Sequence, residues 1–373
     1  MPEHKLYEPT AEDFALAESM MTDEQREMSA EREAFKFQVV DAFEDHLAHI
    51  DKDDERRAAS PEEVHNMDER MRKLGELFDG SDIRWNLDGA FNISIMGGKY
   101  IGVHKDVDIS VEAADLPKFD GLLMKHGYGL FLSSSKDESD PRSPKILERV
   151  GAERFAAADL EHRLIASVDE PGAVSKVVDD LNFIDVHLVT RNAAGRVLGG
   201  GGALLPEKWS TPIKKEFQGY ELNLSHPGKL AFFKLHESRV YDRTDLKKLA
   251  ELGVLTTEDM ADIENSFEAE FAARRRESEV IVTRIMARVT PEMNVKQVVH
   301  EFAVEPAIAA RINSEETPAL NALCAAIVEL KDRDVGRITD IAMDKFGVQK
   351  KFDGERAKVA ELRKWVEERE KAK

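Results

Sequence analysis

The feature that most constrains the fold is the stretch from residue 83 to residue 113. The run VDISVEA, residues 107–113, alternates β-branched apolar residues with polar ones and predicts a half-buried strand. The run IRWNLDG, residues 83–89, predicts another strand, which ends at a glycine turn. Helical patterns follow within the same region, so the chain needs a sheet onto which helices pack.

The rest of the chain extends this pattern to three regions. Further strands are expected at 182–189 and 220–224, with helices at 116–127 and on both sides of Ser238. Apolar residues recur at helical spacing from Phe35 to Leu47, and Ser60-Pro61 starts another helix. The sequence therefore predicts an α+β fold, a mixed β-sheet with packed helices. The predicted domains are an acidic helical region at 1–80, an α/β core at 81–255 and a helical C-terminal domain at 256–373.

Composition limits the classes of function. The 373 residues carry a formal net charge of −20, and residues 1–80 alone hold 10 basic against 23 acidic side chains. Such a balance disfavours broad nucleic-acid binding, because phosphates would be repelled over most of the surface. No apolar run approaches the roughly 18–20 residues of a membrane helix, and the acidic N-terminus lacks the features of an export signal. Together with one cysteine, Cys324, in an apolar helical setting, this predicts a cytoplasmic protein without disulfides.

Three acidic residues form the candidate site. Asp106 and Asp108 stand two apart on one predicted strand, so both carboxylates project to the same face. Asp185, on the strand at 182–189, can supply a third carboxylate, and His187 lies on the same face as Asp185. Mg²⁺ or Mn²⁺ binds such oxygen ligands, and three carboxylates on one face would repel one another without a cation. An Asp-x-Asp pair alone is also common at strand edges where no metal binds.

The wider stretch WNLDGAFNISIMGGKYIGVHKDVDISVE, residues 85–112, resembles the signature of the nucleotidyltransferase superfamily. It looks most like the aminoglycoside and lincosamide small-molecule nucleotidyltransferases, and more distantly like the abortive-infection nucleotidyltransferase toxins. Gly89 takes the place of the turn glycine beside the phosphates, and the segment from His104 to Ile109 that of the metal-binding strand. IDVHLV at 184–189 and YDRTDL at 241–246 are similar to two later motifs of that group. The resemblance covers roughly residues 83–250, in the family's order.

The resemblance implies transfer of a nucleoside monophosphate from a nucleoside triphosphate to a hydroxyl of an acceptor, with release of pyrophosphate. It assigns the cation to Asp106, Asp108 and Asp185, gives Asp185 a catalytic role and makes His187 its orienting companion. The nucleotide-binding residues that it implies are Gly89, His104, Lys234, Arg239, Asp242 and Asp245. It also implies that residues 90–96 form a short helix ending at Gly97-Gly98, although FNISIM is β-branched enough to pass for a strand.

Three departures from the family pattern keep other functions open. Asp88 stands where the family has its first glycine, Gly102 replaces an arginine, and Tyr241 replaces a lysine for which Lys234 or Arg239 would substitute. One alternative is a toxin-like nucleotidyltransferase that acts on tRNA or protein. Another is an inactive domain that serves as a scaffold, with the helical flanks binding protein partners.

Overall fold

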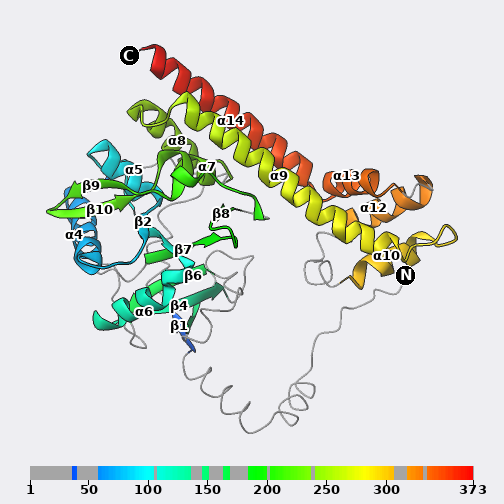
Figure 1. Ribbon diagram of the computed structural model, residues 1–373, viewed down its shortest axis with the longest axis horizontal. Helices are drawn as coiled ribbons and strands as arrows, with labels where there is room; N and C mark the ends of the chain where they lie inside the picture. The colour runs from blue at the N-terminus through cyan, green and yellow to red at the C-terminus, as the bar shows by residue number, and fades with distance from the viewer. Residues whose placement is uncertain are drawn as a thin grey trace, which may run out of the picture. The chain divides into compact units, whose positions relative to one another are not determined.

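The computed structural model describes residues 36–39, 58–104, 107–135, 145–150, 163–168, 184–199, 202–236, 240–305, 317–330 and 334–372. The chain divides into two compact units (Figure 1). Unit 1 comprises residues 1–51, 65–84 and 105–187, and unit 2 comprises residues 52–64, 85–104 and 188–373. The domain boundaries expected at residues 80 and 255 stay a prediction.

The strands expected at 83–89, 107–113, 182–189 and 220–224 are all present, together with strands that were not expected from the sequence. The strands are β1 (Lys36–Val39), β2 (Trp85–Leu87), β3 (Val107–Glu112), β4 (Tyr128–Ser135), β5 (Lys145–Arg149), β6 (Arg163–Val168), β7 (Ile184–Arg191), β8 (Val197–Leu198), β9 (Ile213–Phe217) and β10 (Tyr220–Leu224). The helices are α4 (Pro61–Phe78), α5 (Gly89–Gly97), α6 (Leu116–Lys125), α7 (Pro227–His236), α8 (Val240–Leu252), α9 (Thr257–Met286), α10 (Val295–Ala303), α12 (Thr317–Leu330), α13 (Val335–Lys345) and α14 (Val348–Lys371). The α+β fold class is therefore confirmed.

Unit 1 is built on a sheet with the strand order β1-β5-β4-β6-β7-β3. The pairs β1–β5, β5–β4, β4–β6 and β6–β7 are antiparallel. Helix α6 packs close to β4, and the rings of Phe78 and Phe119 stack with centroids 5.6 Å apart. This order makes β7 and β3 neighbours, so the two strands that carry the predicted acids lie side by side in one unit.

One expectation at the N-terminal end is wrong. The apolar spacing from Phe35 to Leu47 favours a helix, but residues 36–39 form β1, which pairs with β5 in antiparallel register. The sequence KFQV contains an aromatic and a β-branched residue, and pairing with an existing strand outweighs a weak local helical pattern. The remainder of that predicted helix lies outside the described residues.

Unit 2 contains a second group of strands and most of the helices. Strand β10 pairs with β2 in parallel and with β9 in antiparallel orientation. Helices α7, α8, α9 and α14 share a core that includes Trp209, Phe232, Phe267 and Leu362. A separate core joins the C-terminal part of α9 to α10, α12 and α13 around Ile285, Cys324 and Ile338. The all-helical character expected beyond residue 256 is seen throughout the described part of that region.

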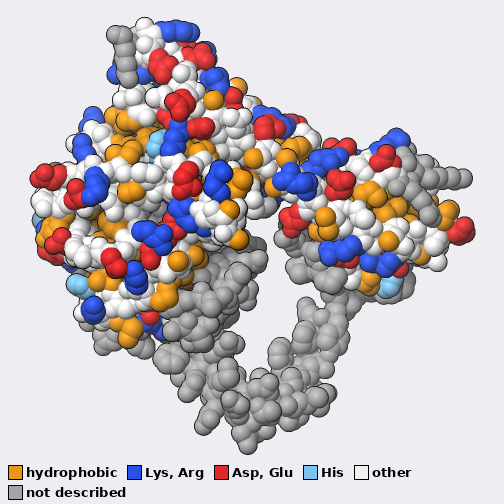
Figure 2. All heavy atoms as spheres, viewed as in Figure 1, with side chains coloured by type: hydrophobic (Ala, Val, Ile, Leu, Met, Phe, Trp, Pro, Cys, Tyr) orange, Lys and Arg blue, Asp and Glu red, His pale blue; other side chains and the backbone are white. Residues whose placement is uncertain are grey.

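Lys, Arg, Asp and Glu side chains are interspersed on the face that Figure 2 shows, rather than gathered by sign. None of the helices in the described part of the chain combines the length and the apolar character that crossing a lipid bilayer requires.

Candidate functional site

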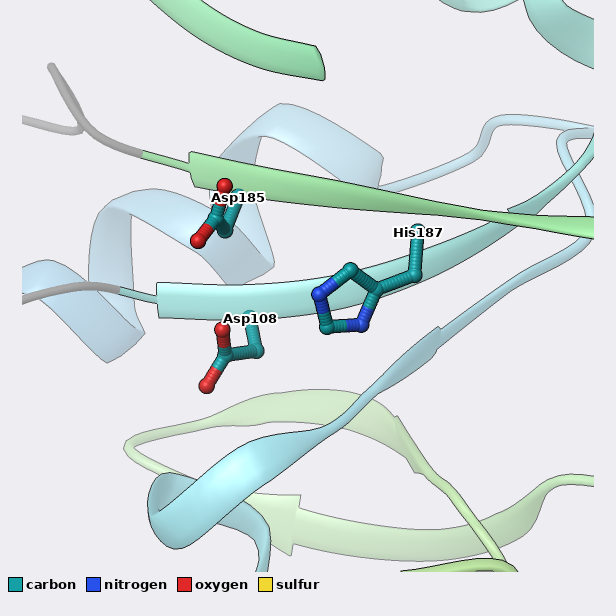
Figure 3. A group of neighbouring side chains, drawn as sticks. All are labelled: Asp108, Asp185 and His187. Atoms are coloured by element: carbon teal, nitrogen blue, oxygen red, sulfur yellow. The ribbon is translucent and has the colours of Figure 1, made fainter. Parts of the chain in front are cut away.

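Two neighbouring strands of unit 1 bring together three of the predicted site residues. Asp108 lies on β3, and Asp185 and His187 lie on β7. Their candidate ligand atoms, one carboxylate oxygen from each aspartate and one imidazole nitrogen, all lie within 4.8 Å of one another. In Figure 3 the three side chains lie on one side of the two strands, and the imidazole ring of His187 is turned toward Asp108. The period of two along β7 explains why Asp185 and His187 share this face.

Burial differs among the three members of this cluster. Asp185 is 6% exposed, Asp108 is partly buried and His187 is exposed. The cluster therefore has a closed side at Asp185 and an open side at His187, from which a ligand can approach. Two carboxylates held this close repel each other unless a cation or a proton lies between them.

The donor set fits a divalent cation. Metal–oxygen and metal–nitrogen bonds of about 2.0–2.3 Å hold ligand atoms roughly 3–4.5 Å apart around one ion. The observed spread of up to 4.8 Å reaches that range with small side-chain adjustments. Two carboxylates and one imidazole are ligands that Mn²⁺ and other first-row cations accept. Asp106, the other acid of the predicted pair, and Arg239 lie outside the described residues.

The glycine turn and the following helix form as the resemblance implies. Helix α5 begins at Gly89 and ends at Gly97, with Gly98 in the left-handed region at φ 70° as its C-terminal cap. Gly89 itself has φ 62°, a conformation that costs side-chain-bearing residues strain. The side-chain amide of Asn92 donates to the carbonyls of Leu87 and Ser225 at 2.7 and 3.1 Å, which anchors the helix to its surroundings. The helix expected at 90–96 is confirmed.

Asp88, the residue that departs from the family pattern, is neutralised within unit 2. The Nζ of Lys229 lies 3.0 and 3.1 Å from the two carboxylate oxygens of Asp88, and it also donates to Ser225 Oγ at 3.1 Å. Both charged side chains are buried, at 5% exposure for Asp88 and 8% for Lys229. A buried carboxylate requires such a partner. The sequence contains no local signal for this pair, because Lys229 follows Asp88 by 141 residues.

His104 is part of the packing around α5. Its Nε2 lies 2.9 Å from Ser94 Oγ, and its ring lies 4.9 Å from that of Phe91 and 6.3 Å from that of Tyr100. Ser94 Oγ also accepts a hydrogen bond from the amide of Ile101. His104 is 5% exposed. These contacts hold the segment after α5 against the helix, and the nucleotide contact expected of His104 stays a prediction.

Three other predicted nucleotide-binding residues meet between α7 and α8. Lys234 Nζ lies 2.6 Å from Asp245 Oδ2 and 3.3 Å from Asp242 Oδ1. All three side chains are at least nine-tenths buried. Lys234, the expected substitute for the lysine missing at Tyr241, is therefore held by the two aspartates of the YDRTDL motif. With Gly89 and His104 they belong to unit 2, whereas the Asp108–Asp185–His187 cluster belongs to unit 1.

Comparison with known proteins gives one informative match. Residues 70–147 match the family model described as aminoglycoside-2''-adenylyltransferase. This segment contains the glycine turn, α5 and the strand that carries Asp108. Among curated proteins, none matches the chain.

Several solved structures align with parts of the chain. The lincomycin-bound lincosamide antibiotic adenylyltransferase LnuA is 15% identical, with 52% of this chain and 99% of that chain covered and a TM-score of 0.34. The antibiotic-resistance factor ANT(2'')-Ia is 9% identical, with 57% and 97% covered and a TM-score of 0.35. A nucleotidyltransferase-like protein from Paracoccidioides brasiliensis is 12% identical, with 54% and 79% covered and a TM-score of 0.28.

The family-model match falls on the stretch in which the ordered motifs begin, and it agrees with the resemblance drawn from those motifs. The predicted resemblance to the small-molecule nucleotidyltransferases is thereby confirmed for residues 70–147.

Proposed function

We propose that the protein transfers a nucleoside monophosphate from a nucleoside triphosphate to a hydroxyl of a small-molecule acceptor. The observation that carries this proposal is the Asp108–Asp185–His187 cluster on neighbouring strands of unit 1. The family-model match over residues 70–147 supports the same reaction class, and its description favours ATP as donor and an aminoglycoside as acceptor.

The chemistry requires few groups from the protein. The acceptor oxygen attacks the α-phosphorus in line, the bond from that phosphorus to the bridging oxygen breaks, and pyrophosphate leaves. A divalent cation, when bound, would neutralise phosphate charge on the attacking and leaving sides. Asp108 and Asp185, with Asp106, would hold that cation. Catalysis then rests on positioning and on charge compensation rather than on covalent chemistry by the chain.

Asp185 has a second possible task within this reaction. The acceptor hydroxyl loses a proton as its oxygen bonds to phosphorus, and a carboxylate within hydrogen-bond reach can accept it. Asp185 is the more buried of the two described acids, so its position is the better defined by packing. We assign it to this role in addition to cation binding.

Two observations favour this function over the alternatives. The face in Figure 2 presents interspersed charges rather than a broad basic area, which gives no support to a tRNA acceptor. The ion pair with Lys229 compensates the charge of Asp88, one of the departures from the family pattern that kept an inactive domain open. Binding of protein partners by the helical flanks stays a prediction.

The test is pyrophosphate release by the full-length protein with each nucleoside triphosphate, Mg²⁺ or Mn²⁺ and a panel of aminoglycosides. Asp108→Asn and Asp185→Asn should each lower the rate by about a hundredfold or more. The matched control is Asp82→Asn, which removes an exposed carboxylate of unit 1 outside the cluster and should leave the rate unchanged. The proposal fails if no nucleotide binds and no pyrophosphate forms, or if the three variants behave alike.

A further inference from the structure

We propose that His187 is a direct nitrogen ligand of the cation held by Asp108 and Asp185, and that this makes the site prefer Mn²⁺ to Mg²⁺. The inference rests on the proposed function, because it concerns the cation which that reaction uses. It replaces the orienting role that the family resemblance implies for His187.

The position of the imidazole supports ligation. An imidazole nitrogen of His187 lies within 4.8 Å of both carboxylates at once, and small side-chain adjustments bring this to the spacing of three ligands around one ion. A histidine that only orients Asp185 would need to approach that carboxylate alone. His187 instead reaches across from β7 toward Asp108 on β3 (Figure 3).

The exposure of the His187 side chain also supports its role as a ligand. His187 is exposed while Asp185 is buried, so the ring lies on the open, solvent side of the cluster, from which a ligand can approach. A neutral imidazole adds a ligand without adding a third negative charge to a site that already holds two. Phosphate oxygens and water would supply the remaining ligands.

The donor set then determines the preferred cation. Mg²⁺ demands oxygen ligands in near-ideal octahedral geometry and gives up its waters reluctantly. Imidazole ligands suit first-row transition metals, and Mn²⁺ accepts both carboxylate oxygen and imidazole nitrogen. One nitrogen among the protein ligands should therefore raise the affinity for Mn²⁺ while adding little for Mg²⁺.

The test measures metal binding, not catalysis. Full-length protein is loaded with Mn²⁺ in a nitrogen-free buffer, with and without inorganic pyrophosphate, which supplies phosphate oxygens but no nitrogen. Pulsed electron paramagnetic resonance then detects ¹⁴N coupled to the bound Mn²⁺. Calorimetry gives the Mn²⁺ and Mg²⁺ affinities of the wild type, of His187→Gln and of His126→Gln, a matched control at another exposed histidine of unit 1.

The expected result is ¹⁴N coupling in the wild type and in His126→Gln, and its loss in His187→Gln. The ratio of Mn²⁺ to Mg²⁺ affinity should fall about tenfold or more in His187→Gln. The inference is overturned if wild-type Mn²⁺ shows no ¹⁴N coupling, if Mn²⁺ does not bind, or if the coupling persists in His187→Gln. The wild-type spectrum decides the matter even where a variant folds poorly.

The two proposals fail separately. Nitrogen coupling without nucleotidyl transfer under any metal would leave the inference standing and remove the proposed function. Transfer with Mg²⁺ or Mn²⁺ and no nitrogen at the metal would retain the function and remove the inference.

Discussion

The buried pair Asp88–Lys229 offers a sharp test of how unit 2 accommodates the acid at the glycine turn. Lys229→Met removes the cation and leaves the Asp88 carboxylate at 5% exposure with its main charge partner gone. Breaking one member of a buried ion pair costs about 3–5 kcal/mol, because the remaining charge stays desolvated. Asp88→Asn should cost a comparable amount through the stranded ammonium group.

The double variant separates this explanation from simple loss of contacts. If the two substitutions acted independently, their costs would add to about 6–10 kcal/mol. If instead each single change leaves an unpaired buried charge, the double variant Asp88→Asn/Lys229→Met removes both charges. Its free energy of unfolding should then lie within about 2 kcal/mol of the wild-type value. The magnitude of the coupling therefore decides between the two accounts.

Urea denaturation followed by tryptophan fluorescence is the suitable assay. The three tryptophans, Trp85, Trp209 and Trp365, all belong to unit 2, so the signal reports the unit that contains the pair. A loss of about 4 kcal/mol lowers the denaturation midpoint by roughly 1.5 M for a urea m-value of about 2.5 kcal/mol/M.

The matched control is Lys214→Met, which breaks the exposed pair Lys214–Glu221 of unit 2. An exposed pair contributes about 0–1 kcal/mol, so its midpoint should barely move. A cost below about 1 kcal/mol for Lys229→Met, or a double variant as unstable as the sum of the singles, would refute the reasoning.

Three further predictions concern other residues of unit 2. Burial lowers the pKa of His236, but hydrogen bonds to Glu270 and Glu355 outweigh it and raise that pKa above 6.5. The stabilising contribution of protonated His236 is thus complete below pH 6.5 and is lost as the pH rises through the raised pKa. The Tm should therefore fall more steeply from pH 6 to 9 in the wild type than in His236→Gln. Parallel curves of Tm against pH for the two proteins would contradict this. Burial raises the pKa of the Cys324 thiol to about 12. A thiol reagent at pH 8 should therefore react at least about a hundredfold more slowly with the folded protein than with the urea-unfolded protein. Equal rates would show that the thiol is accessible in the folded protein. Gly89→Ala should cost about 1–2 kcal/mol in urea denaturation because Gly89 has φ 62°, and an unchanged midpoint would mean that the turn relaxes.

The candidate site was only partly predictable. Asp185 and His187 share a face because strand side chains alternate, and that follows from two positions in one run. Their approach to Asp108 depends on β7 and β3 being neighbours, although 77 residues separate the two aspartates. Periodicity gives the face of each strand but not the partner that pairs with it.

Local patterns explain what the sequence alone determined. The strand at 107–112, the helix start at Ser60-Pro61 and the helical C-terminal region follow from residues a few positions apart. Such interactions are short in sequence, so they are present in the pattern itself.

Only the tertiary structure decided the features that depend on distant segments. Residues 36–39 became a strand by pairing with β5, and Asp88 acquired Lys229 as its counter-charge. His187 came within reach of Asp108 when β7 was placed beside β3. In each case the free energy comes from burial and from contacts between segments far apart in the chain, which a local pattern of residue types does not encode.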